Sequence, residues 1–373
     1  MWPMLPFWQG QQEKPGVTRS YPLHLNVRPD GYVGQADGPN RGEIVAGYAG
    51  ADYGFITPPP GASEWGTAIG ERKLRALKKF AGTLDGQSIL EIGGGNLFFA
   101  QTLRREHTIA RYVAIDPTLR VWPEDTGAEV HRAYYPCPEL AGEKFDLVLA
   151  NSCLEHIPDP RAFLAAIRDS LAETGRVFLT FPDVSRQFAD GDLGAIVHEH
   201  FVYLDEPSAR ILFARCGFEV EQWATESDLA SCLLKLADVG EGLSSEAAIA
   251  ATALLARAID GFSVRLPRAA AALDAELQAG RKIAFYGATN GLNNFLYATG
   301  IGCHVPVLDG DRAKRGRFLP AGTTSIKWVG DADLAQFERI VVTAASFQQS
   351  IVRSLTETYG VPGQQICGLF RRD

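Results

Sequence analysis

The sequence has no Cys-x-x-Cys pair, and none of its six cysteines precedes Cys137. Cys232 lies within the apolar run Leu229–Leu234, a setting that is typical of a buried free thiol. Disulfides and a thiolate zinc site are therefore not expected, and unpaired thiols of this kind are typical of a reducing compartment. We predict a cytoplasmic protein that holds no metal.

The sequence also lacks an excess of positive charge, since 36 Lys and Arg residues stand against 44 Asp and Glu residues and the formal net charge is −8. Polyphosphate backbones would not be attracted in bulk, so we expect no nucleic-acid partner. No apolar run approaches the length of a membrane span without charges or helix breakers. Met1–Trp8 contains two prolines and no basic leader, so neither a membrane partner nor a signal peptide is expected.

The 373 residues are enough for two α/β domains with additional segments. Residues 1–61 are rich in Pro, Gly and Tyr and have little periodicity, which predicts an irregular N-terminal cap over the next domain. Residues 62–240 alternate strands with helices and predict a parallel sheet. Residues 241–280 predict a helical connector kinked at Pro267, and residues 281–373 predict a second, Rossmann-like α/β domain.

The alternation fixes approximate bounds for each element. In the first domain, the predicted strands are Ser88–Ile92, Tyr112–Asp116, Glu129–Tyr134, Phe145–Ala150, Arg176–Phe181, Phe218–Thr225 and Ala230–Ala237, and the predicted helices are Ala62–Phe80, Asn96–Arg105, Arg161–Leu171 and Pro207–Cys216. The last two strands are too close in sequence for a parallel crossover and predict an antiparallel hairpin at the sheet edge. In the second domain, the predicted strands are Ile283–Gly287, Val305–Asp309, Ser325–Val329, Arg339–Thr343 and Gln365–Phe370.

A glycine-rich turn follows the first strand, where Glu91–Asn96 reads Glu-Ile-Gly-Gly-Gly-Asn. Glycines let a backbone bend sharply and approach a ligand, and Asp116 at the end of the next strand can bind ribose hydroxyls. A dinucleotide fingerprint would need a further glycine where Phe98 stands. S-adenosylmethionine (SAM) needs no pyrophosphate cradle, and Glu91 suits its positively charged amino-acid portion. A glycine turn that binds no ligand is the alternative.

A second candidate site is the loop His198–His200, which follows the fifth strand at the carboxyl end of the sheet, where ligands bind. A neutral histidine there can remove a proton while the neighbouring Glu199 orients it. Three alternatives stay open: a metal pair, for which no third ligand is evident, a solvated loop, and a hydrogen-bonded structural histidine.

These features resemble the class I SAM-dependent methyltransferases. The resemblance covers Ala62–Val239 and includes Phe145–Asn151, Leu154–Asp159 and the run Phe201–Trp223. It implies a Rossmann-like, seven-stranded methyltransferase domain whose cofactor is SAM. The residues implied to bind SAM are Glu91, Gly93, Gly94, Gly95, Asn96 and Asp116, with Asn151 beside the methyl group and Tyr135 and Pro136 beside the adenine.

A wider resemblance, to the nucleotide-sugar C-methyltransferases of deoxysugar biosynthesis, includes the Glu-His-Phe-x-Tyr run that begins at Glu199 and the C-terminal motifs Tyr286–Gly291 and Asp309–Pro320. It implies a small-molecule substrate, a nucleoside-diphosphate 4-keto sugar that is methylated on carbon. By this resemblance His200 is the catalytic base and Glu199 its partner, with His198 beside them, and Tyr286 and Asn290 bind substrate.

The chain departs from that family at several positions. It lacks the paired cysteines of an N-terminal zinc-binding segment, and it has Val197 where the family has a tyrosine and Asn290 where members often have lysine. Tyr53, or Tyr48, is the candidate for the missing hydroxyl. The Gly287-x-x-x-Gly291 turn either cradles a phosphate or packs a lobe that closes over the active site. An O- or N-methyltransferase that uses His200 or His156, a non-catalytic SAM-binding protein and an oxidoreductase are the alternative functions.

Overall fold

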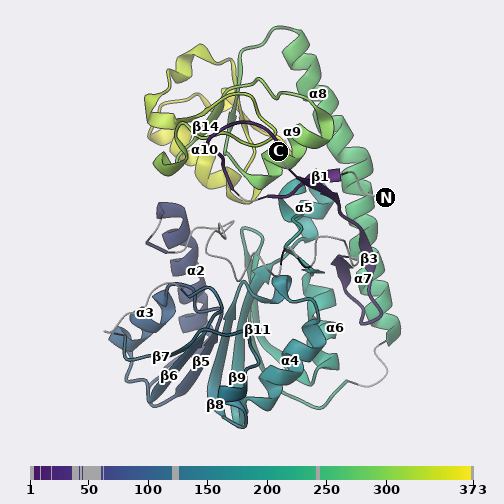
Figure 1. Cartoon of the computed structure of the whole chain (residues 1–373). Helices are drawn as coiled ribbons and strands as arrows, with labels where there is room; N and C mark the ends of the chain where they lie inside the picture. Colours follow the sequence, from purple (N-terminus) through teal and green to yellow (C-terminus); the bar gives the residue numbers. More distant parts are fainter. Residues whose placement is uncertain are drawn as a thin grey trace.

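The computed structural model describes residues 4–8, 10–17, 19–35, 42, 44, 60, 61, 63–119, 126–240 and 244–370. These residues form two lobes, which lie one above the other in Figure 1. The lower lobe is built on a seven-stranded sheet and the upper lobe on a five-stranded sheet. A long helix composed of α7 (Ser244–Asp260) and α8 (Leu266–Gln278) runs along both lobes.

The seven-stranded sheet is parallel except for one reversed strand. Its order is β11-β12-β9-β8-β5-β6-β7, and β12 is antiparallel to both of its neighbours. The strands are β5 (Ser88–Ile92), β6 (Arg111–Ile115), β7 (Glu129–His131), β8 (Phe145–Asn151), β9 (Leu171–Pro182), β11 (Phe218–Glu226) and β12 (Leu229–Leu236). The predicted α/β, Rossmann-like fold is confirmed. The carboxyl ends of the parallel strands meet at one edge, where ligands bind in such sheets.

The hairpin of β11 and β12 is antiparallel as predicted, but only one of its strands lies at the sheet edge. β12 is inserted between β9 and β11. Its segment Ala230–Leu234 is buried throughout, whereas most residues of β11 are partly or fully exposed. The more apolar strand therefore takes the interior position, and the more polar strand covers it.

Three of the five helices of this lobe begin at side-chain caps that the sequence supplies. The five helices are α2 (Glu64–Ala81), α3 (Phe98–Glu106), α4 (Pro160–Asp169), α5 (Ser185–Asp190) and α6 (Glu206–Arg215). The side chains of Ser63, Asp159 and Asp205 accept N–H bonds at the starts of α2, α4 and α6. The predicted start of α3 at Asn96 is wrong, because Leu97 has a left-handed backbone (φ 60°) that cannot belong to the helix.

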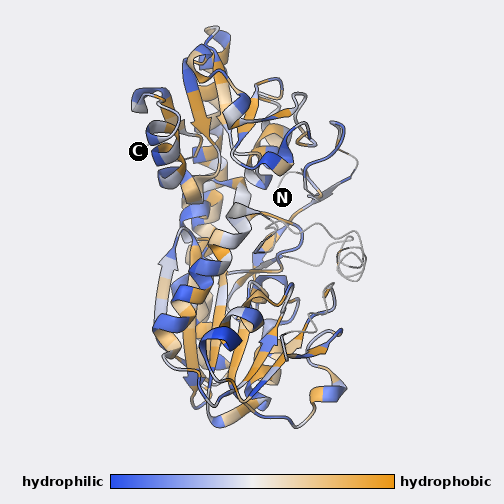
Figure 2. Ribbon diagram, turned by 90° about the vertical axis from the view of Figure 1, so that its left-hand side faces the viewer, coloured by the Kyte–Doolittle hydropathy of each residue, from blue (hydrophilic) through white to orange (hydrophobic). Residues whose placement is uncertain are grey.

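Two apolar clusters cover the two faces of the sheet. One contains Phe181 and packs α4 and α6 onto the sheet, and the other contains Phe178 and packs α2 and α3. Figure 2 shows the corresponding concentration of hydrophobic residues on the strands. Adjacent residues of one strand point to opposite faces, so both faces need apolar side chains.

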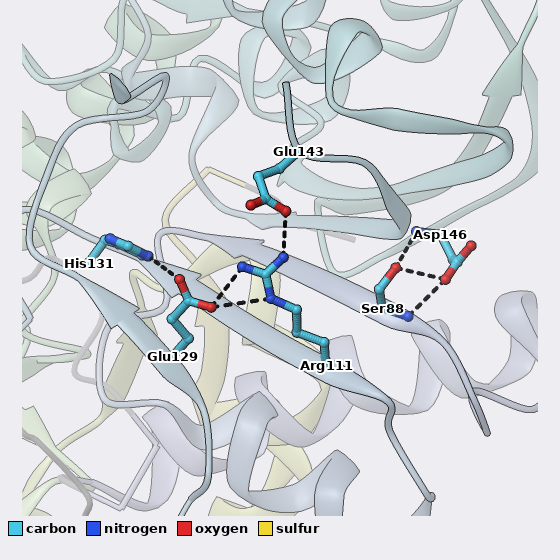
Figure 3. Close-up of polar contacts among 6 residues, drawn as sticks. All are labelled: Ser88, Arg111, Glu129, His131, Glu143 and Asp146. Atoms are coloured by element: carbon cyan, nitrogen blue, oxygen red, sulfur yellow. Dashed lines mark hydrogen bonds and ion pairs between the residues drawn. The ribbon is translucent and has the colours of Figure 1, made fainter. Parts of the chain in front are cut away.

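Polar contacts join the strands at the amino-terminal edge of the sheet, opposite the ligand edge (Figure 3). Arg111, the first residue of β6, lies 2.8 Å from Glu129 and 2.5 Å from Glu143. Ser88, the first residue of β5, donates its N–H and hydroxyl to the Asp146 carboxylate at 2.8 and 2.7 Å. Contacts that are this exposed contribute little stability each, but they fix how the strands start.

The upper lobe is wholly parallel, with the order β15-β14-β13-β16-β17. Its elements are β13 (Ile283–Tyr286), α9 (Asn290–Thr299), β14 (Val307–Asp309), β15 (Ile326–Trp328), β16 (Arg339–Val342), α10 (Gln348–Glu357) and β17 (Ile366–Gly368). All five predicted strands are present, each shorter than predicted at one or both ends.

The connector between the lobes is helical, as the sequence predicts, but the irregularity precedes the proline. A π-helical turn, Gly261–Arg265, separates α7 from α8, and Pro267 lies in the first turn of α8, where its missing N–H needs no partner. Within the described residues, the segment Ser245–Gln278 is long and apolar enough to cross a membrane by length and composition alone, contrary to the expectation that no run approaches that length. Buried helices pass the same test, and α7 packs against α5 and α6.

The N-terminal segment, which the sequence predicts to be an irregular cap, has short strands in the parts that the structure describes. Its described parts contain β1 (Met4–Pro6), β2 (Ser20–Pro22), β3 (Leu25–Val27) and β4 (Val33–Gln35), and β4 also pairs with β10 (Val202–Tyr203). The segment contacts the upper lobe as well, since Gln12 and Phe318 exchange backbone hydrogen bonds of 2.9 and 2.8 Å. Short strands of this kind carry too little periodicity to be recognised in sequence.

Candidate active site

The glycine turn between β5 and α3 depends on left-handed backbone at two positions. Gly93 (φ 77°) has no room for a side chain, because a Cβ atom there would lie 2.3 Å from the Cys153 sulfur. Gly95 (φ 54°) faces open space instead, with no atom within 4 Å of a Cβ position. A ligand can therefore approach the backbone at Gly95, as the sequence predicts for the cofactor.

Asp116, directly after β6, is tied to this turn. One carboxylate oxygen accepts the Gly95 N–H at 2.9 Å, and the other accepts the N–H and hydroxyl of Thr118 at 2.6 and 2.7 Å. The turn and the acid thus come from neighbouring parallel strands, and each holds the other in place. Carboxylate oxygens have further lone pairs with which to accept ribose hydroxyls.

Glu91 lies at the end of β5 and is only 3% exposed. Its carboxyl group accepts a 2.7 Å hydrogen bond from the Tyr112 hydroxyl. Burial raises the pKa of Glu91 to about 8, although the Tyr112 bond lowers it, and the nearby Asp116 adds to the increase. A buried acid of this kind ionises most readily when a cation is bound beside it.

Asn96, which was predicted to bind the cofactor, contacts the chain itself. Its side-chain amide donates to the Pro60 carbonyl at 2.6 Å. Asn96 therefore ties the segment before α2 to the glycine turn. Gly94 is tightly packed, since a Cβ there would lie 3.2 Å from the Ala114 side chain.

The carboxyl end of β8 continues the site on the other side of β5. Asn151 is held by Thr180 through a 3.3 Å bond to its oxygen, and its amide nitrogen is buried without a partner in the described structure. Ser152 has a left-handed backbone (φ 52°), which is uncommon for a residue other than glycine. The Cys153 thiol then turns back to the Ile92 carbonyl, 3.3 Å away. An unpartnered donor and a strained residue at one strand end are typical of a ligand site.

Lys73 and Glu155 are two residues of this site that the sequence-based prediction missed. The Lys73 ammonium group, from α2, donates to the Ser152 hydroxyl at 2.7 Å. Burial lowers the pKa of Lys73 and raises the pKa of Glu155, while the opposite charges of the two groups counteract both shifts. Lys73 belongs to a helix outside the recognised motifs. Glu155, in contrast, is part of the Leu154–Asp159 motif and could have been identified there.

His200 is placed against His156, and their rings pack edge to face at 4.9 Å. Burial, chiefly, lowers the pKa of His200 well below the usual value, and His156 adds to the decrease. Burial also lowers the pKa of His156 to about 4. Both rings are therefore neutral at physiological pH and can accept a proton. Glu199, 5% exposed, contributes its backbone carbonyl, which lies 3.1 Å from Nδ1 of His156.

His198 does not join this pair. Its ring packs against Phe7 and Tyr21, and its Nε2 lies 3.1 Å from the Tyr21 carbonyl. Burial lowers the pKa of His198. The loop turns at these residues, with the His200 N–H bonded to the Val197 carbonyl at 3.2 Å, so His198 packs under the N-terminal strands while His200 reaches the site. His198 is the hydrogen-bonded structural histidine that the sequence left as an alternative.

The N-terminal segment also supports the histidine loop from outside. The Gln35 side chain donates to the carbonyls of His198 and His200 at 3.1 and 3.5 Å, and its backbone N–H donates to Phe201 at 3.1 Å. The Tyr203 hydroxyl donates to the Val197 carbonyl at 3.1 Å. These contacts fix the backbone on which His200 is carried.

The predicted substrate-binding residues do not meet in this site. Tyr286 lies in a buried cluster of the upper lobe, and burial strongly raises the pKa of its hydroxyl. Asn290 is buried and donates to the Ile196 carbonyl at 3.2 Å. Tyr53, like Tyr48, lies outside the described residues. The prediction that Tyr286 and Asn290 bind substrate stays a prediction, and the structure places both side chains in the upper lobe, away from the histidine pair.

Three groups in the site have the composition of a metal centre. Glu155, His156 and His200 each offer one ligand atom, and these atoms lie within 4.8 Å of one another. The sequence suggested His198 and His200 as a metal pair without a third ligand. In the structure, His200 is instead grouped with His156 and Glu155. The Lys73 ammonium group acts electrostatically on Glu155 and bonds to the Ser152 hydroxyl. The expectation that no metal is held stays a prediction.

Comparison with known proteins supports a domain assignment. Residues 67–222 match the family model described as a methyltransferase domain. The ubiquinone biosynthesis O-methyltransferase of Aeromonas salmonicida is 27% identical over 141 residues, covering 32% of this chain and 57% of that protein. The corresponding protein of Dinoroseobacter shibae is 33% identical over 120 residues, covering 31% of this chain and 45% of that protein. The chain spans about half the length of the curated relatives it matches.

Among solved structures, a SAM-dependent methyltransferase from Mesorhizobium loti covers 47% of this chain and 98% of its own, at 14% identity and a TM-score of 0.38. The family model includes the glycine turn, Asp116, the Asn151–His156 segment and the histidine loop. Residues 67–222 of the chain therefore match a methyltransferase domain, and they contain most strands of the mostly parallel seven-stranded sheet.

Proposed function

We propose that the whole chain is a SAM-dependent methyltransferase that acts on a small polar metabolite, and that it methylates carbon in a nucleotide-linked keto sugar. SAM, when bound, supplies an electrophilic methyl group. Gly95 and Asp116 provide an open backbone turn and a ribose acceptor for it. Glu91 provides negative charge for its cationic portion, and Lys73 provides positive charge for its carboxylate.

The methyl acceptor needs a base, and the histidine pair meets that requirement. A ketone acidifies the neighbouring C–H, so a neutral imidazole can remove the proton and leave an enolate to attack the methyl group. His200, which is buried and neutral, is the proposed base. His156 packs on its ring, and the Glu155 carboxylate lies 4.0 Å from Nε2 of His156. The negative charge of Glu155 would stabilise a proton that arrives at the pair.

One observation carries this proposal: the cofactor turn and the histidine pair are joined by a single short segment. Cys153 contacts the strand end before Gly93 at 3.3 Å, and Glu155 and His156 follow within three residues. A methyl donor at the turn and a substrate at the histidines would therefore share one space. Methyl transfer requires that the donor and the acceptor be held next to each other in this way.

The proposal is tested with nucleoside-diphosphate 4-keto sugars in deuterated water. The enzyme should exchange the substrate proton next to the ketone without SAM, and with SAM it should form a C–CH3 product and the demethylated cofactor. His200→Asn should abolish exchange while the affinity for SAM stays nearly unchanged. His198→Asn is the matched control, expected to retain exchange if the chain stays folded. Turnover without His200 would contradict its role.

O-methylation is the second candidate, and the names of the matching relatives favour it. In that case His200 or His156 would deprotonate a hydroxyl group, and no carbon-bound proton would exchange. NMR of the methylated product separates the two, since O-methyl and C-methyl groups have distinct spectra. Failure to form demethylated cofactor with any polar metabolite pool would instead favour a protein that binds SAM without catalysis.

A further inference from the structure

The upper lobe holds the loop that precedes the histidines, and it does so through two asparagines. In the first turns of α9, the Asn290 amide donates to the Ile196 carbonyl at 3.2 Å. The Asn294 amide donates to the carbonyls of Leu193 and Ile196 at 3.1 and 2.9 Å. Both asparagines are buried. Three hydrogen bonds therefore join the upper lobe to two carbonyls of the methyltransferase lobe, those of Leu193 and Ile196.

A third asparagine on the same helix accepts a hydrogen bond instead of donating one. Asn293, fully buried, accepts the Ala321 N–H through its oxygen, within the upper lobe. Among the described residues, its amide nitrogen has no partner, while Asn290 and Asn294 leave their oxygens without partners. Asn290 and Asn294 thus act only as donors to the loop, and Asn293 acts only as an acceptor.

The loop also fills the amino-terminal end of α9, which the sequence offered as a phosphate cradle. A Cβ atom on Gly291 would lie 3.0 Å from the Gly194 Cα and 3.1 Å from the Asp192 carboxylate. Glycines at 194 and 291 allow the two backbones to meet, and Asp192 puts a negative charge near the positive end of the helix. The chain itself occupies the place that a phosphate would take, so of the two readings of this turn the structure favours packing.

The held loop connects directly to His200. The Val197 carbonyl, directly after the held Ile196, accepts the His200 N–H at 3.2 Å. We propose that Asn290 and Asn294 are positioning residues, which fix residues 193–196 and, through the Val197–His200 turn, the orientation of the His200 ring. The upper lobe then sets the geometry of the base in the lower lobe. This inference rests on the proposed role of His200, but its test does not require turnover.

A matched series of Asn→Asp substitutions tests the proposal in the full chain. Asp keeps the acceptor oxygen and removes the donor, so Asn290→Asp and Asn294→Asp lose the loop bonds, while Asn293→Asp keeps its bond to Ala321. All three variants bury a carboxyl group, so Asn293→Asp controls for the free-energy cost of burying it. NMR of histidines labelled at the ring carbon then follows the His200 signal against pH. Loosening should admit water and raise the pKa of His200 by about one unit or more in the first two variants only.

Gly291→Ala provides a second variant that avoids buried charge. Alanine favours the helix over glycine by about 1 kcal/mol, but its methyl group would press on Gly194 and Asp192. We expect the upper lobe to stay folded and the His200 signal to shift as in the Asp variants. With a substrate in hand, kcat should fall about 10-fold or more and its acidic limb should move to higher pH, with SAM affinity unchanged.

The proposal would be overturned if the His200 titration were the same in wild type, Asn294→Asp and Gly291→Ala. It would also be overturned if Asn293→Asp moved the signal as far as Asn294→Asp, because the effect would then come from the fold of the upper lobe. A moved His200 titration without any methyl transfer would leave the positioning role intact and count against the proposed function instead.

Discussion

At the scale of single residues, Glu91 and Asp116 have the same carboxyl chemistry in different surroundings. Asp116 accepts three hydrogen bonds from backbone and hydroxyl donors. The Glu91 carboxyl group is buried and, among the described residues, accepts one side-chain hydrogen bond, from the Tyr112 hydroxyl. Burial without compensating charge favours the neutral acid. The two acids look equivalent in sequence, but burial raises the pKa of Glu91 to about 8.

SAM binding should depend on pH through Glu91. Its pKa is raised to about 8, so below that pH a proton must leave before the carboxylate can face a cation. Affinity measured by calorimetry should therefore rise between about pH 6 and pH 8, by up to tenfold per unit, and level off above. Glu91→Gln should bind more weakly and without this dependence. A pH-independent affinity in wild type would exclude Glu91 as the partner of the cationic portion.

Lys73 should contribute to cofactor affinity rather than to the fold. Replacement by methionine keeps the apolar stem and removes the ammonium group that contacts Ser152. A charge-assisted contact to a carboxylate contributes about 1.5–3 kcal/mol, so SAM should bind roughly 10- to 100-fold more weakly. The exposed Lys79 of the same helix is the matched control. If Lys73→Met and Lys79→Met had equal affinities for SAM, Lys73 would have no part in the site.

At the scale of elements, the turn between β5 and α3 is constrained by the segment that follows β8, because Cys153 of that segment packs against Gly93. Gly93→Ala would place a methyl group against the Cys153 sulfur as well as straining φ. We expect a loss of at least about 2 kcal/mol in unfolding free energy and weaker SAM binding. Adding Cys153→Ala to the Gly93→Ala variant should recover part of the lost unfolding free energy, because it removes the clash. Gly95→Ala, with open space around it, should cost only the strain. Thermal unfolding of Gly93→Ala, Cys153→Ala, the double variant and Gly95→Ala checks the order, and additive losses in the double variant would contradict it.

The sequence predicts elements better than it predicts which side chains meet. The alternation of strands and helices placed most of these elements within a few residues of their bounds in the structure, although β9 begins five residues before the predicted strand. The left-handed Leu97 displaced the start of α3, since such a backbone has no signal in a leucine. The order of β11 and β12 followed from burial that only the sheet reveals.

Site prediction failed where a role depends on the direction of a side chain. His198 and His200 are two residues apart and face opposite sides, so one sequence motif contains a packing residue and a candidate base. His156 and Lys73 reach the site from distant segments, and no local pattern links them to His200. Asn290 fits a ligand motif in sequence, but its amide holds the chain's own backbone.

At the scale of the whole molecule, one apolar core spans the parts that the sequence separates. A single cluster contains Leu25 of the N-terminal strands, Phe188 of α5, Leu254 of α7 and Leu292 of α9. The predicted cap, connector and second domain therefore share a core with part of the methyltransferase lobe. Burial of this kind makes the parts stabilise one another, and independent unfolding would expose the shared residues to water.

Cofactor binding should therefore stabilise the upper lobe as well. A ligand that binds only the folded state stabilises every part that unfolds with its site, by RT ln(1 + [L]/Kd), or about 2.7 kcal/mol at one hundred times Kd. Hydrogen exchange measured by mass spectrometry should show slower exchange on adding SAM in peptides that contain β13 and β16, as well as in those around the glycine turn. Leu292→Ala, at a fully buried position, should cost about 2–5 kcal/mol and reduce that protection. If SAM slowed exchange around the glycine turn while β13 and β16 exchanged as before, the two lobes would be energetically separate despite their common core.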